Sequence, residues 1–110
     1  MSDNIDYSAL KWIKKELDIT LKDAGVALEK YVEENIEDEL DVVAKGFHQV
    51  YGTLQIVEIY GASLLLEEME LVIAGLKSGE IKQKDDAVEV VSRAIIQIPD
   101  YLERLQSGHK

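Results

Sequence analysis

The sequence predicts an all-α protein, an antiparallel up-and-down four-helix bundle, on three observations. First, the composition favours helices, since the 110 residues include one proline and seven glycines and are rich in Leu, Ile, Val, Ala, Glu and Lys. Second, apolar residues recur three and four positions apart through four successive stretches. Third, the connections between these stretches are short, so consecutive helices should pack side by side and bury their apolar faces against one another.

The first predicted helix runs from Asp6, as its N-cap, to about Glu34. Trp12 lies beside the centre of its apolar stripe, and we expect it to form a partly buried flank. The alternative is that Trp12 contacts a neighbouring chain. Residues 35–38 lose the pattern and predict a short connection. The stripe consists of Leu10, Ile13, Leu17, Leu21, Ala24, Leu28 and Tyr31.

The second helix is predicted from about Asp38 towards Tyr60, with Gly61 as its end. The third begins near Ala62 and closes at residues 77–79, where a lysine and a glycine suit a helix C-terminus. A polar connection over residues 80–84 leads to a fourth helix capped by Asp85. The three stripes are Leu40, Val43, Phe47, Val50, Leu54 and Val57, then Leu65, Met69, Val72 and Leu76, then Val88, Val91, Ile95, Ile98, Leu102 and Leu105.

Pro99 lies inside the fourth predicted helix. It cannot donate a hydrogen bond to the carbonyl of Ile95, and an interior proline costs a helix about 3 kcal/mol. The helix should therefore either kink or divide at this point. Because the apolar spacing continues from Val88 to Leu105 without a slip, we expect a kink.

Charge and composition restrict the possible partners and the compartment. Twelve Lys and Arg against twenty-two Asp and Glu give a net charge of −10, which argues against nucleic acid or an anionic membrane as a partner. The absence of cysteine fits a reducing compartment, and no apolar run reaches the roughly 18 to 20 residues that span a bilayer. We therefore expect one cytoplasmic domain over residues 1–110, without direct membrane contact, that binds other proteins.

Several catalytic classes lack their sequence motifs. A di-iron bundle needs a Glu-x-x-His motif on each of two helices, and neither histidine has a glutamate three residues before it. The acidic cluster 67–70 has no histidine beside it, so a solvated helix face is expected there rather than a metal site. There is no Gly-rich phosphate loop and no nucleophile elbow. We expect no stand-alone catalysis, no metal and no cofactor.

His48 is the sharpest chemical signal. At ~100° per residue, it points roughly 130° away from the centre of the second apolar stripe, so its ring should reach solvent. Gly52 follows one turn later, and its missing side chain should leave room for another protein to approach the ring. An exposed imidazole is largely neutral near pH 7 and is a competent nucleophile towards a phosphoryl group. It needs no base of its own if a partner supplies magnesium and stabilises the transition-state charge.

Ile56 and Ile59 also point away from the second stripe. Exposed apolar groups near a polar centre suggest a docking patch for a partner. The alternative is that both isoleucines are buried against an additional element or a bent helix end.

The spacing of His48 and Gly52 resembles the histidine phosphotransfer domain, in which a glycine stands four residues after the histidine. The stretch 48–70 is similar to the N-terminal region of the chemotaxis-type hybrid histidine kinases of bacterial type IV pilus systems, as are residues 6–12 and 95–102. The resemblance covers nearly the whole chain. It implies an N-terminal fragment of a longer hybrid kinase, with a phosphorelay role in surface motility. The implied partners are the aspartates of receiver (response regulator) domains and a kinase catalytic domain.

Two positions differ from the phosphotransfer pattern. Tyr51 stands where a lysine is usual, and Gly61 comes thirteen residues after the histidine instead of ten. We expect Tyr51 and Gln55 to flank the phosphoryl group as hydrogen-bond donors, and Lys45 to replace the missing cation in part. The alternative function is that of a degenerate, non-phosphorylated adaptor domain that binds a regulatory protein.

Overall fold

The computed structural model describes residues 7–108 and contains four helices in that range. They are α1 (Tyr7–Glu34), α2 (Glu39–Ile56), α3 (Tyr60–Ser78) and α4 (Lys84–Gly108). The predicted N-cap at Asp6 and the second histidine, His109, lie outside the described residues.

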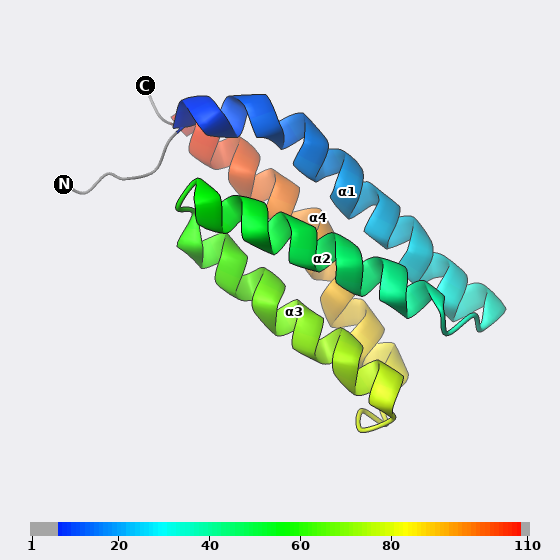
Figure 1. The fold of residues 1–110 in the computed structure, drawn as a ribbon. Helices are drawn as coiled ribbons and strands as arrows, with labels where there is room; N and C mark the ends of the chain where they lie inside the picture. The colour runs from blue at the N-terminus through cyan, green and yellow to red at the C-terminus, as the bar shows by residue number, and fades with distance from the viewer. Residues whose placement is uncertain (1–6, 109–110) are drawn as a thin grey trace.

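The four helices form a closed ring of neighbours (Figure 1). Helix α2 packs between α1 and α3, and α4 closes the bundle by contacting both α3 and α1. Short turns join consecutive helices, so neighbours run antiparallel, and the body measures 44 × 22 × 19 Å. The predicted antiparallel four-helix bundle is confirmed.

The core lies along the axis of the bundle and receives apolar side chains from every helix. Full burial of each large aliphatic side chain contributes about 1.5–3 kcal/mol, so these residues dominate the stability. The largest of the fully buried side chains are Leu10, Leu21, Leu40, Val43, Phe47, Val50, Leu54, Ile59, Leu66, Ile73, Ile98 and Leu102.

Helix α4 is not divided at Pro99 but continues through it as one element, and the kink expected there stays a prediction. Its N-terminus differs from the expectation. The helix begins at Lys84, so Asp85 lies inside the first turn and is not its cap. A carboxylate there still favours the positive end of the helix dipole.

The end of α2 is the main departure from the prediction. The helix stops at Ile56, five residues before Gly61, and Glu58 takes a left-handed conformation with φ 64°. The amide of Ile59 donates to the carbonyl of Leu54 at 2.9 Å, and the amide of Glu58 donates to that of Gln55 at 3.1 Å. This is the Schellman arrangement, in which glycine usually occupies the left-handed position. Because a glutamate occupies the left-handed position here, no glycine in the sequence indicates that α2 ends at this point.

The flank expected at Trp12 is also wrong, since its side chain is 83% exposed. Trp12 lies beside the apolar stripe of α1, and its side chain is therefore not covered by α2 or α4. Over residues 7–108, no helix combines the length and the apolar character needed to cross a bilayer.

Candidate functional site

His48 lies on the outer side of α2, and its side chain is 72% exposed, as predicted. The preceding residue, Phe47, is fully buried and points into the core. Because adjacent residues on a helix are separated by ~100°, the anchoring of Phe47 directs His48 outward. The imidazole is therefore presented to solvent by a helix that is fixed on its opposite side.

Glu70 on α3 holds the imidazole from one side. His48 Nδ1 lies 3.3 Å from each carboxylate oxygen of Glu70. An ionised carboxylate can only accept hydrogen bonds, so Nδ1 carries the proton in this contact. The lone pair of Nε2, on the other side of the ring, is then free to act as a nucleophile.

Tyr51 and Gly52 shape the rest of this surface. The ring of Tyr51 lies 6.0 Å from the imidazole, centroid to centroid, at an interplanar angle of 26°. A Cβ atom added to Gly52 would meet no other atom within 4 Å. Tyr51 thus borders the imidazole, and Gly52 leaves the open space that the sequence predicts.

Gln55 and Lys45 form no hydrogen bond or ion pair with His48 in the described part of the chain. The side-chain amide of Gln55 donates to the hydroxyl of Ser63 at 3.0 Å, and Ser63 donates to the carbonyl of Tyr60 at 3.0 Å. Ser63 is fully buried, and the hydrogen bond from Gln55 therefore helps to close the α2–α3 turn. Lys45 is exposed and, among the described residues, forms no ion pair.

The predicted docking pair separates into two different environments. Ile56 is 81% exposed, as expected, whereas Ile59 is 1% exposed and belongs to the core. The exposure predicted for Ile59 is wrong because the turn at Glu58 ends α2 and redirects the chain into the bundle. For Ile59, burial at a helix end, the alternative considered above, is what the structure shows.

Glu70 is the residue that sequence reasoning missed, since its acidic cluster was expected to be a solvated face. Glu67 and Glu68 are indeed exposed, but Glu70 is partly buried. It lies four residues after Leu66 and three before Ile73, both fully buried. That spacing places Glu70 at the edge of the buried face of α3, which was the available signal. Across residues 7–108, no group of three or more metal-ligating side chains is gathered.

Comparison with known proteins gives one distant relative. A scaffold protein, FimL of Pseudomonas aeruginosa, is 24% identical over 104 residues. The match covers 94% of this chain and 18% of that protein, so the chain spans less than a fifth of its relative. No family model matches the sequence, and no solved structure matches significantly. The similarity supports a distant relationship to this scaffold protein along almost the whole chain.

Proposed function

We propose that this bundle is a phosphotransfer-type domain in which His48 accepts a phosphoryl group and passes it on. One observation carries the proposal: an exposed imidazole is held at Nδ1 by Glu70, and Gly52, one turn further along α2, has open space at its Cβ position. The N-terminal and central stretches that resemble hybrid kinases of type IV pilus systems point to the same role.

The transfer step uses only groups that this site and its partner hold. The lone pair of Nε2 attacks the phosphorus of an aspartyl phosphate or of the γ-phosphate of ATP. The new N–P bond forms as the P–O bond to the leaving carboxylate or ADP breaks, and the leaving oxygen keeps the electron pair. Nδ1 retains its proton, so the phosphorylated ring gains positive charge. The Glu70 carboxylate lies where it stabilises that charge.

The partner supplies what the described chain does not. Phosphoryl transfer needs magnesium and positive charge around the phosphoryl oxygens. The position usually held by a lysine is Tyr51, which borders the imidazole but carries no positive charge. A receiver domain or kinase catalytic domain would therefore bring its own metal and cation to the open face at Gly52.

Labelling tests this function directly. The purified chain is incubated with a phosphorylated receiver domain, or with a kinase catalytic domain and ATP, taken from the same signalling system. We expect acid-labile, base-stable phosphate on the wild type and none on His48→Gln. His109 is retained in that variant and serves as an internal control. If a phosphotransfer domain known to accept phosphate from the same donor is labelled while the wild-type chain is not, phosphotransfer is ruled out.

A second candidate function is that of an adaptor, favoured by the distant similarity to a protein named as a scaffold. The exposed Ile56 next to the α2–α3 turn offers an apolar contact for a partner. An adaptor would bind its partner equally well as wild type and as His48→Gln, without phosphate label, but would bind weakly as Ile56→Glu. Ile19→Glu, on the exposed side of α1, is the matched control. Equal binding by Ile56→Glu would remove Ile56 from the interface.

A further inference from the structure

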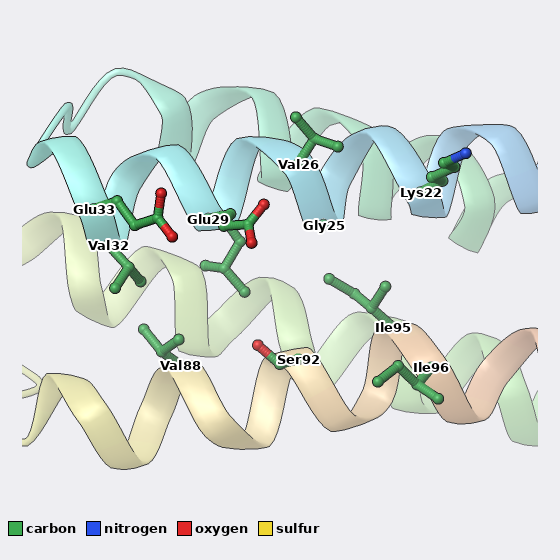
Figure 2. Close-up of a pocket in the computed structure, with 11 residues that line it drawn as sticks. Lys22, Gly25, Val26, Glu29, Val32, Glu33, Val88, Ser92, Ile95 and Ile96 are labelled. Carbon is green, nitrogen blue, oxygen red and sulfur yellow. The ribbon is translucent and has the colours of Figure 1, made fainter.

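A groove runs between α1 and α4, on helices other than the two that carry His48 and Glu70 (Figure 2). Its volume is about 490 Å³. A smaller hollow of about 120 Å³ shares Val32 and Val88 with it and continues towards Asn35 and Lys84. The main groove is lined by Lys22, Gly25, Val26, Leu28, Glu29, Val32, Glu33, Val88, Ser92, Ile95 and Ile96.

The floor of the groove is apolar. Val32 and Val88 face each other from the two helices, and Ile95 reaches towards Gly25 (Figure 2). Ile96 is 72% exposed, and Val26 and Val32 are also exposed, although they are large apolar residues. A partner that covered their exposed apolar surface would gain stability from its removal from water. The intramolecular core leaves these side chains available for such a contact.

The charges along the groove select the partner. Glu29 and Glu33 present their carboxylates at the groove from α1 (Figure 2). Both are exposed, and neither forms an ion pair with another residue between 7 and 108. Lys22 is the basic residue among the groove's lining. With a net chain charge of −10, the surface favours a basic partner. A second copy of this acidic chain is disfavoured by the same charges.

We infer that the α1–α4 groove binds an amphipathic helix of a partner protein whose apolar face is flanked by Lys or Arg. From Lys22 to Glu33 the groove follows α1 for about 17 Å, at a rise of ~1.5 Å per residue, which accommodates about three turns of helix. Apolar side chains at i, i+3, i+4 and i+7 of that helix enter the groove, and its basic residues meet Glu29 and Glu33. The inference does not depend on phosphorylation of His48.

A designed peptide serves as the probe. It is a helix of about four turns with leucines at the i, i+3, i+4 and i+7 positions and lysines beside them. Its matched partner carries glutamate in place of every lysine. Fluorescence anisotropy should show the lysine peptide binding at least about tenfold more tightly than the glutamate peptide. The double variant Glu29→Lys, Glu33→Lys should reverse this preference.

Two controls separate the groove from general attraction. Ile96→Glu should weaken binding of the lysine peptide about tenfold, whereas Val90→Glu, exposed on α4 outside the groove, should not. The charge control is Glu16→Lys with Asp23→Lys, both exposed on α1 and outside the groove, which should keep the preference.

Four outcomes would overturn the inference. They are no binding of the lysine peptide, equal binding of both peptides, a preference that the Glu16 and Asp23 variant reverses as well, and a dimer of the free chain that Ile96→Glu dissociates. Labelling of His48 is measured on the same Ile96→Glu protein. If Ile96→Glu loses peptide binding but His48 is still labelled, peptide binding in the groove and phosphorylation of His48 are independent functions.

Discussion

His48 on α2 and Glu70 on α3 meet across the interface between these helices, with Nδ1 3.3 Å from the carboxylate, although 22 residues separate them in the chain. The contact orients an exposed ring without covering it. It also makes one nitrogen of the ring the donor and leaves the other free, which is the state that a nucleophilic histidine needs.

Glu70→Gln should lower phosphoryl uptake by His48 about tenfold. The amide preserves the shape and a hydrogen-bond acceptor but removes the negative charge, and charge-assisted hydrogen bonds are roughly twice as strong as neutral ones. A loss of ~1.4 kcal/mol in the transition state corresponds to that factor. The measurement is the initial rate of labelling, with Glu67→Gln, exposed one turn earlier on α3, as the control. Equal rates for both variants would leave Glu70 without a role in the transfer.

Gly52→Ala should stabilise the protein by about 1 kcal/mol, because alanine favours a helix and its Cβ meets nothing within 4 Å. Urea unfolding measures this change. Phosphoryl uptake should persist in Gly52→Ala and be lost in Gly52→Leu, whose longer side chain occupies the approach to the imidazole. Uptake by Gly52→Leu at the wild-type rate would show that the open surface at Gly52 is not the approach path.

Ile59→Ala should destabilise the fold by about 2–5 kcal/mol, since Ile59 is a core residue. Ile56→Ala, three residues earlier, should change the free energy of unfolding by no more than about 0.5 kcal/mol because its side chain is exposed. Chemical denaturation of the two variants compares them directly. Similar values would contradict the position of the turn at Glu58.

Gly75→Ala should destabilise the protein by about 1–3 kcal/mol through overpacking. The new Cβ would lie 2.6 Å from Cδ1 and 2.7 Å from Cγ1 of Ile81, which packs over α3. In an Ile81→Ala background those atoms are absent and the nearest remaining atom, Cβ of residue 81, is 3.7 Å away. The double-mutant cycle should therefore show that the cost of Gly75→Ala disappears. If Gly75→Ala destabilises the Ile81→Ala protein as much as the wild type, the loss of stability comes from the backbone and not from contact with Ile81.

The ion pairs of Lys14 should make the stability of the bundle depend on pH in the alkaline range. Burial lowers the pKa of Lys14, but the hydrogen bonds and charges of Asp18 and Glu103, at 2.8 Å and 3.4 Å, outweigh burial and raise it above 10.5. Between 10.5 and this higher value the folded state binds more protons than the unfolded state, so stability falls as pH rises. Urea unfolding of wild type should be unaffected by this group below about pH 10 and should weaken above it. In Lys14→Met this part of the pH dependence should be absent, and an identical alkaline profile would contradict the ion-pair assignment.

Apolar periodicity, with the composition and the short connections, predicted the four helices and the bundle, and periodicity alone predicted the outward direction of His48. Phe47 shows why, since a residue anchored in the stripe of a helix determines where its neighbour points. The open surface at Gly52 was predictable in the same way. The direction of His48 and the open surface at Gly52 are properties of a single helix and can be predicted without knowledge of its surroundings.

Only the tertiary structure decided which residues meet and where α2 ends. Glu70 contacts His48 because α3 packs against α2 in one particular register. The spacing of residues within either helix does not specify that register. Ile59 is buried because Glu58 adopts a left-handed conformation, which the packing of Ile59 into the core compensates. Local propensity predicts that α2 ends at Gly61. The helix ends at Ile56 instead, because the earlier turn allows Ile59 to be buried in the core.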